Sequence, residues 1–113
     1  MIVKLSSIAY ARSGDKGSNS NIGVIFINNM LYRWSLNNLT SDIVAKHFDN
    51  FLNGEIERFE LDNLNSLNFI LYDSLGGGGS ESLLIDAQGK TYAQHLLNLE
   101  IDLPDKFKEY LNE

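Results

Sequence analysis

A run of apolar residues, Ile22–Ile27 (I-G-V-I-F-I), constrains the fold more than any other segment. Its mostly β-branched side chains are typical of a central strand that is buried on both faces of a sheet. Gly23 interrupts the run, which predicts the close approach of another backbone or a helix at that point. The chain therefore has to build a sheet around this segment.

A long polar stretch, Ala11–Asn21, separates this run from Ile2–Tyr10, whose alternation predicts another strand. We expect the two strands to pair antiparallel, with the stretch as an oversized loop between them. A connection that only turned the chain would need fewer residues, so we interpret the loop as a binding surface. Its candidate site residues, which are glycines, charged residues or short polar residues, are Arg12, Ser13, Gly14, Asp15, Lys16, Gly17, Asn19 and Asn21.

Two segments with helical features follow the apolar run. The first is a short helix over Met30–Leu36. The second has its N-cap at Thr40 or Ser41, carries apolar residues at helical spacing, and ends at Gly54.

The segment Glu55–Leu61 predicts a further strand. Its alternation suggests that Phe59 and Leu61 face inward and that Arg58 and Glu60 face outward.

The secondary structure of Leu64–Leu75 stays open. Its leucines fall at helical spacing, whereas Phe69–Tyr72 fits a strand equally well. The remaining expected elements are a strand at Ser82–Asp86, a helical or extended piece at Thr91–Leu96, a strand at Leu97–Leu103 and a short helix that starts at Pro104.

This order of elements, ββαβαββ, predicts a single domain over residues 1–113. We expect an α+β fold of the ferredoxin-like type, a two-layer sandwich with a mostly antiparallel sheet and helices on one face.

Charge and composition exclude several classes of function. With 113 residues and a net charge of −6, the chain lacks the basic surface that non-specific nucleic-acid binding requires. No apolar run approaches the roughly 18 residues that span a bilayer. The first residues, MIVKLSS, lack the apolar core of a signal peptide, and the chain has no cysteine. We therefore expect a cytoplasmic protein that binds no membrane.

The most specific motif is Ile8–Gly17 (I-A-Y-A-R-S-G-D-K-G), followed by Asn21–Ile25 (N-I-G-V-I). It resembles the opening of the ferredoxin-fold domain of the acyclic terpene utilisation protein AtuA family. Weaker matching segments follow in the same order, among them Arg58–Leu61, Leu67–Phe69, Leu75–Gly78 and Asp86–Lys90. The resemblance implies that the glycine run after Leu75 is native. It also implies an accessory domain or small subunit that acts with a larger AtuA-like partner in acyl-CoA or terpenoid catabolism.

Further polar residues in the matching segments are candidates to line a pocket with the Arg12–Asn21 loop. The alternative roles are capping for Asn63, a satisfied buried amide for Asn68 and turn formation for Gln88. The additional candidates are Asn63, Asn68, Gly76, Gly77, Gly78, Gln88 and Lys90.

Known catalytic and cofactor motifs do not match. The G-x-x-G spacing at Gly14 departs from the phosphate-binding loop pattern, and no cluster has calcium or zinc spacing. We therefore expect no metal and no cofactor. Arg12 and Lys16 could hold a small carboxylate or phosphate, unless Arg12 pairs with Asp15.

No residue is assigned a catalytic role from the sequence. Ser13 and Ser18 lack a visible base, because His47 lies on an apolar helix stripe and His95 has no evident partner. Three hypotheses stay open. The protein is an accessory subunit of a larger AtuA-like partner, a small-molecule binding or catalytic domain that uses the loop, or a structural module that forms a homo-oligomer.

Overall fold

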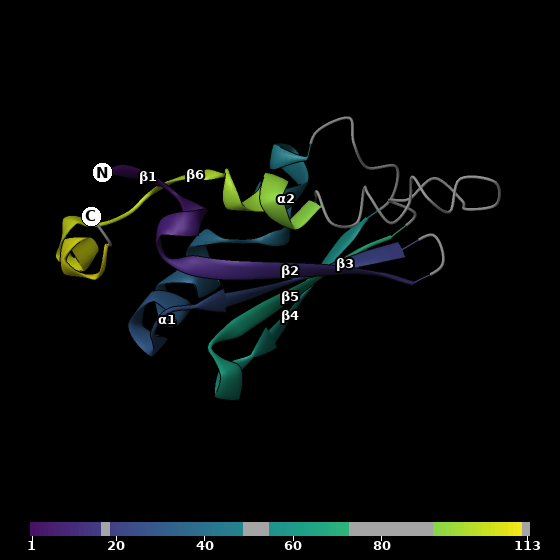
Figure 1. Cartoon of the computed structure of the whole chain (residues 1–113), viewed down its shortest axis with the longest axis horizontal. Coiled ribbons are helices and arrows are strands. Elements are labelled where there is room, and N and C mark those ends of the chain that lie inside the picture. The colour runs from purple at the N-terminus through teal and green to yellow at the C-terminus, as the bar shows by residue number, and fades with distance from the viewer. Residues whose placement is uncertain (17–18, 49–54, 73–91, 112–113) are drawn as a thin grey trace.

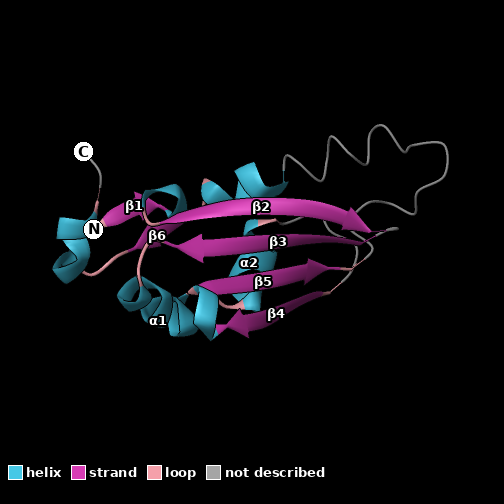
Figure 2. Cartoon of the chain, turned by 60° about the horizontal axis from the view of Figure 1, so that its bottom comes forward, coloured by secondary structure: helices cyan, strands magenta, loops and turns pink. Residues whose placement is uncertain are grey.

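Four antiparallel strands form the main sheet, in the order β2-β3-β5-β4 (Figures 1 and 2). A computed structural model describes residues 1–16, 19–48, 55–72 and 92–111. The strands of the main sheet are β2 (Ala9–Lys16), β3 (Asn19–Phe26), β4 (Ile56–Leu61) and β5 (Ser66–Leu71). A second, two-stranded sheet pairs β1 (Ile2–Lys4) with β6 (Glu100–Asp102).

The predicted antiparallel pairing of the first hairpin is confirmed, but the oversized loop is wrong. β2 and β3 pair continuously from Ala9 and Phe26 to Lys16 and Asn19. The polar stretch therefore consists mainly of strand residues, and its Gly17 lies outside the described part of the chain. Pairing with a neighbouring strand overrides the weak strand propensity of glycine, asparagine and aspartate.

The single strand expected over Ile2–Tyr10 is also wrong, because the 3₁₀ helix η1 (Leu5–Ser7) divides it into β1 and β2. Leu5 and Ile8 are both fully buried. Residues three apart point to opposite faces of a strand but to the same side of a 3₁₀ turn. The turn thus allows both side chains to reach the core.

Helices cover one face of the main sheet. They are α1 (Asn29–Asn38), α2 (Ser41–His47) and a third helix over residues 92–97. In Figure 2, α2 lies behind the strands, so the opposite face of the sheet is turned to the viewer. Both short helices that were expected here are confirmed, and the N-cap at Thr40 is confirmed by the hydrogen bond that its Oγ1 accepts from Ile43 N. The predicted end at Gly54 is wrong, because α2 ends at His47 with Phe48 as its C-cap; Gly54 itself lies outside the described residues.

The core lies between the helices and alternate residues of the two central strands. Ile22 and Val24 of β3 and Phe69 of β5 are fully buried, whereas Ile25 is 42% exposed. The prediction that β3 is buried on both faces is therefore wrong. No described helix packs on the face that carries Ile25.

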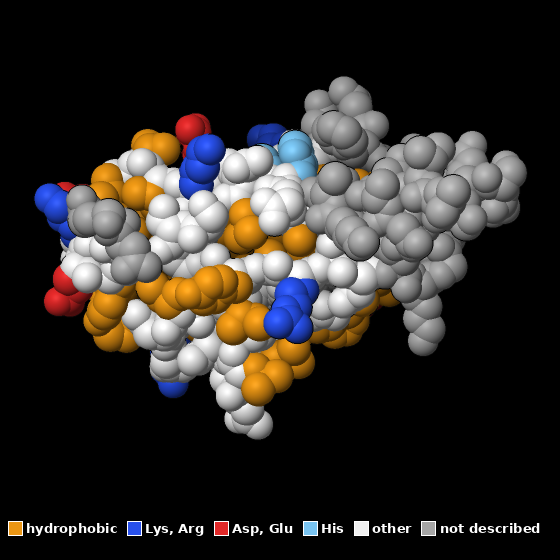
Figure 3. Space-filling view, in the orientation of Figure 1, with side chains coloured by type: hydrophobic (Ala, Val, Ile, Leu, Met, Phe, Trp, Pro, Cys, Tyr) orange, Lys and Arg blue, Asp and Glu red, His pale blue; other side chains and the backbone are white. Residues whose placement is uncertain are grey.

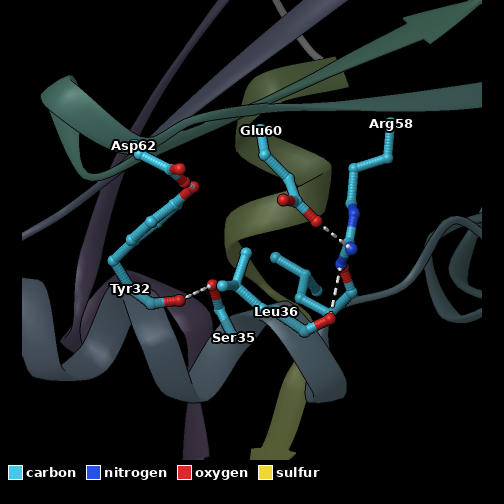
Figure 4. Close-up of polar contacts among 7 residues, drawn as sticks. Tyr32, Ser35, Leu36, Arg58, Glu60 and Asp62 are labelled. Atoms are coloured by element: carbon cyan, nitrogen blue, oxygen red, sulfur yellow. Dashed lines mark hydrogen bonds and ion pairs between the residues drawn. The ribbon is translucent and has the colours of Figure 1, made fainter.

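The inward and outward faces of β4 are the reverse of those expected. Arg58 is directed toward the helices, and its Nη1 donates hydrogen bonds to the backbone oxygens of Leu36 and Leu39, each at 3.0 Å (Figure 4). Its Nη2 also donates to Glu60 at 2.9 Å. Phe59 is instead 44% exposed on the opposite face. The orphan carbonyls at the end of α1 explain why a charged side chain takes the inward position.

The segment Leu64–Leu75 contains strand β5, so the strand alternative is confirmed and the helix is wrong. Asn65 turns the chain into β5 with a left-handed φ of 50°. β5 then pairs with β3 on one side and with β4 on the other. This double pairing satisfies the backbone and overrides the helical spacing of the leucines.

The strand expected over Leu97–Leu103 is shorter than predicted. Residues 92–97 are helical and β6 begins only at Glu100, while the expected terminal helix is η3 (Asp105–Tyr110), of the 3₁₀ type. Phe107 of η3 is buried against the core. The strand expected at Ser82–Asp86 lies outside the described residues.

The predicted α+β, ferredoxin-like fold is confirmed. β3 and β4 are parallel to each other, are connected through α1 and α2, and have β5 inserted between them. This is the split β-α-β arrangement of ferredoxin-like folds. β2 occupies one edge of the sheet and β4 the other.

Replacing Arg58 tests its role in fixing α1 on the sheet. We expect Arg58→Met to lower the free energy of unfolding by about 2 kcal/mol, because two helix carbonyls lose a charged donor. The exposed Arg33 on α1 is the control, and Arg33→Met should change the same quantity by less than about 0.5 kcal/mol. Urea unfolding of the three proteins makes the comparison, and equal losses would contradict the assigned role.

Candidate functional site

The uncovered face of the main sheet brings several predicted site residues together in two neighbouring rows. Strand register aligns one residue from each strand in each row, in the order β2, β3, β5, β4. The first row is Arg12, Gly23, Asn68 and Phe59. The second row is Gly14, Asn21, Ile70 and Glu57. Arg12, Gly14, Asn21 and Asn68 were candidates from the sequence.

A pair of side-chain amides lies at the centre of these rows. Asn21 Nδ2 donates a hydrogen bond to Asn68 Oδ1, and the two atoms are 3.2 Å apart. Within the described part of the chain, this is the one side-chain hydrogen bond that either amide makes. The amide nitrogen of Asn68 and the amide oxygen of Asn21 are therefore available to a binding partner.

Two glycines leave room for the amide pair. A Cβ atom added to Gly14 would lie 3.0 Å from Asn21 Oδ1, which is closer than normal packing allows. A Cβ atom added to Gly23 would lie 3.9 Å from Asn68 Oδ1, an ordinary contact distance. The close approach of a backbone or a helix that was expected at Gly23 is therefore not found, and the tight contact at Gly14 is with a side chain.

Large hydrophobic side chains surround the amide pair on the same face. Figure 3 shows hydrophobic patches and a basic side chain over the region where Figure 1 draws β2, β5 and β4. Tyr10 is 67% exposed, and Ile25, Phe59 and Leu61 are each more than 40% exposed. Clusters of exposed apolar side chains commonly mark interaction sites. We call this surface the open face; it consists of Tyr10, Arg12, Gly14, Asn21, Gly23, Ile25, Glu57, Phe59, Leu61, Ser66, Asn68 and Ile70.

The charges of the open face lie at its two edges. Arg12 of β2 is exposed and makes no ion pair or hydrogen bond with any described side chain. Glu57 of β4 accepts a hydrogen bond from the Tyr72 hydroxyl at 2.7 Å, which raises the pKa of Tyr72. The alternative pairing of Arg12 with Asp15 involves a side chain that the structure does not describe.

Comparison with known protein families identifies the family of this chain. Residues 3–102 match the AtuA ferredoxin-like domain. The chain belongs to this family. No curated protein and no solved structure gives a match. Among the described helices, none is long and apolar enough to cross a membrane.

The motif Ile8–Gly17, on which the resemblance to the AtuA ferredoxin-like family rests, can now be located in the fold. Residues 9–16 of the motif form the edge strand β2, so alternate motif residues lie on opposite faces of the sheet. Tyr10, Arg12 and Gly14 lie on the open face, whereas Ala9 is buried on the helix side.

Other predicted site residues are not part of the open face. Ser13 lies in a row with the buried Ile22 and Phe69, on the helix side of the sheet. Asn63 is exposed in the 3₁₀ helix η2 (Asp62–Leu64), at the opposite end of the sheet from Asn19, so the structure does not bring these two candidates together. η2 has no side-chain cap either, so the alternative role of Asn63 as a cap is also wrong.

Some predicted site residues stay untested. The backbones of Asp15, Lys16 and Asn19 pair at the far end of the hairpin, but the side chains of Asp15 and Lys16 are not described. The candidates outside the described residues are Gly17, Gly76, Gly77, Gly78, Gln88 and Lys90.

Sequence reasoning missed the apolar members of the open face. Tyr10 was assigned to a strand without a direction, whereas Ile25 was expected to be buried and Phe59 to face inward. Side chains alternate between the two faces of a strand, but the sequence does not show which residues of different strands are neighbours. The strand register supplies this, and it places Tyr10, Ile25 and Phe59 on the face of Arg12 and Asn68.

A second polar cluster holds α1 against the end of β4. The Tyr32 hydroxyl donates to Asp62 Oδ1 at 2.5 Å, and Ser35 Oγ donates to the backbone oxygen of Tyr32 (Figure 4). Burial, and then the hydrogen bond to Asp62, raises the pKa of Tyr32 to about 12. The hydroxyl therefore remains a donor at neutral pH, and the cluster has a structural role.

The two histidines meet in the helical layer. The rings of His47 and His95 stack with centroids 4.4 Å apart, and each Nε2 donates to the backbone oxygen of the other residue. Local sequence patterns do not predict this contact, because 48 residues separate the pair. Within the described residues, no three His, Asp or Glu side chains are grouped as metal ligands would be.

Replacing Gly14 tests the geometry of the amide pair. We expect Gly14→Ala to lower the free energy of unfolding by about 1 kcal/mol, because the new methyl group crowds Asn21 Oδ1. In an Asn21→Ala background the same change should cost little, because the crowded oxygen is gone. Gly23→Ala is the matched control, and urea unfolding measures all four variants. If Gly14→Ala lowered the free energy of unfolding by the same amount with Asn21 present and with Asn21→Ala, the described contact would be contradicted.

Proposed function

We propose that the protein is an accessory subunit that docks through its open face onto a larger AtuA-like partner. The reaction context would be the acyl-CoA or terpenoid catabolism that the family resemblance implies. The main support for this proposal is that exposed apolar side chains lie on the same face as an amide pair with unused hydrogen-bonding groups. No described helix covers this face.

The composition of the open face supports docking. Protein interfaces are enriched in aromatic residues and arginine and depleted of lysine and glutamate in their centres. Tyr10, Phe59 and Arg12 provide such anchors, and the only acidic member of the open face, Glu57, lies on an edge strand. A partner that covered this face would gain apolar burial and could also satisfy the amides of Asn21 and Asn68.

The described residues offer less support for catalysis. The open face carries an arginine, two amides and two glycines, but no histidine. The stacked histidines instead use their Nε2 atoms to hold two helices together.

A small anionic ligand is the second candidate. The exposed guanidinium of Arg12 lies in the same row as Asn68, and both present donors to the same face. Such donors suit a carboxylate or a phosphate, including the phosphates of an acyl-CoA. Calorimetry of the isolated protein with acyl-CoA, repeated with Arg12→Ala, separates this candidate from docking alone.

Two isoleucines on opposite sides of the molecule allow a matched test of docking. Ile25 on the open face and Ile43 on α2 have exposed fractions of 42% and 38%. We expect Ile25→Glu to weaken binding to a large AtuA-like protein from the same genome at least tenfold, because it places a charge in the docking centre. Ile43→Glu should leave binding unchanged.

The measurement is co-purification of tagged variants after co-expression, followed by titration of the purified proteins. Circular dichroism checks that both variants are folded. Equal weakening by both variants, or no complex with the wild-type protein, would refute docking through this face.

A further inference from the structure

We infer that, without its larger partner, the open face closes on a second copy of the chain. The two sheets would pack face to face about a two-fold axis parallel to the strands, with β2 of each copy over β4 of the other. This inference uses the same face as the proposed function and rests on it only for the claim that a larger partner displaces the second copy.

The placement of charge favours this symmetry. Arg12 lies on the edge strand β2 and Glu57 on the opposite edge strand β4. A two-fold axis parallel to the strands exchanges the two edges, so each Arg12 faces the strand that carries Glu57 of the other copy. The two residues lie one row apart, an offset of about 7 Å along the strands, which a long arginine side chain can cover.

A face-to-face dimer could also form about a two-fold axis that is perpendicular to the strands and parallel to the sheet, but this arrangement is unfavourable. An axis perpendicular to the strands would place β2 over β2 and bring the two Arg12 side chains to the same edge. Like charges in a water-poor interface repel each other and suppress that arrangement.

Side-chain size is also complementary across this axis. Where β2 lies over β4, Arg12 lies opposite Phe59, which suits a cation–π contact, and Tyr10 lies opposite Leu61. Where β3 lies over β5, Gly23 lies opposite Asn68, and Ile25 lies opposite the small Ser66. Gly14 lies opposite Glu57, which places the carboxylate one row along the strand from Arg12.

The size of the face indicates a weak dimer. Four strands about 4.8 Å apart and six paired residues rising about 3.4 Å each give a face of roughly 400 Å². This flat footprint is small beside the roughly 800 Å² of accessible surface that each partner contributes to a standard interface. A weak dimer of this kind can protect the apolar face and still give way to a partner that binds more tightly.

Exchanging the charged residues Arg12 and Glu57 tests the inference on the isolated chain of 113 residues. Sedimentation equilibrium of the wild-type protein should show a monomer–dimer equilibrium. Arg12→Glu and Glu57→Arg should each weaken dimerisation at least tenfold, because each places like charges opposite one another twice. The double variant should return to within about threefold of the wild-type dissociation constant.

A mixture of the two single variants is the sharpest readout. In the mixed dimer every facing pair has opposite charges, so the mixture should dimerise although neither variant does so alone. Far-ultraviolet circular dichroism controls for folding, since Glu57→Arg also removes the hydrogen bond from Tyr72.

A wild-type chain that stays monomeric at millimolar concentration would overturn the inference. So would single variants that are not restored by mixing. Neither result bears on the complex with a larger subunit, which co-purification measures separately.

Discussion

The contact between Arg58 and the end of α1 fixes the helical layer against the edge strand β4. Arg58 places its guanidinium against the backbone oxygens of Leu36 and Leu39, on the helix side of β4. Because side chains alternate along a strand, this contact directs Phe59 to the opposite face. The cluster of Tyr32 and Asp62 fixes the same helix at the end of the strand. One face of the sheet is thereby covered, and the other retains exposed apolar side chains.

The open face combines features that are costly for an isolated protein. Glycines in the strands weaken the sheet, and exposed aromatic and aliphatic side chains favour association. The amide pair of Asn21 and Asn68 depends on the missing side chain of Gly14. Such features are consistent with a surface shaped for contact with another molecule, which would provide the missing apolar contacts and hydrogen-bonding partners. The same surface explains both the proposed subunit docking and the inferred pairing of free copies.

Local sequence signals predicted much of the fold. The apolar run Ile22–Ile27, the N-cap at Thr40 and the family motif were sufficient to predict the central strand, the second helix and the ferredoxin-like class. The signals failed where tertiary pairing decides the outcome. The leucines of Leu64–Leu75 have helical spacing, yet β3 and β4 pair with this segment from both sides and make it a strand.

The candidate site was predictable only in part for the same physical reason. Arg12, Gly14 and Asn21 are conspicuous as polar residues in the family motif, and Asn68 was a candidate in a later matching segment. That they share a face with Phe59 and Ile25 depends on strand register, and that Arg58 rather than Phe59 faces the helices depends on the hydrogen bonds that Arg58 makes with the end of α1. Neither is visible in local spacing, because both join residues that are distant in the chain.

Hydroxyl-radical footprinting of the protein, free and bound to a large AtuA-like subunit, tests the central claim most directly. Tyr10 and Phe59 report on the open face, and the exposed Met30 on α1 reports on the opposite layer. The account predicts that the complex strongly protects Tyr10 and Phe59 and leaves the oxidation of Met30 unchanged. Protection of Met30 with Tyr10 and Phe59 still reactive would contradict it.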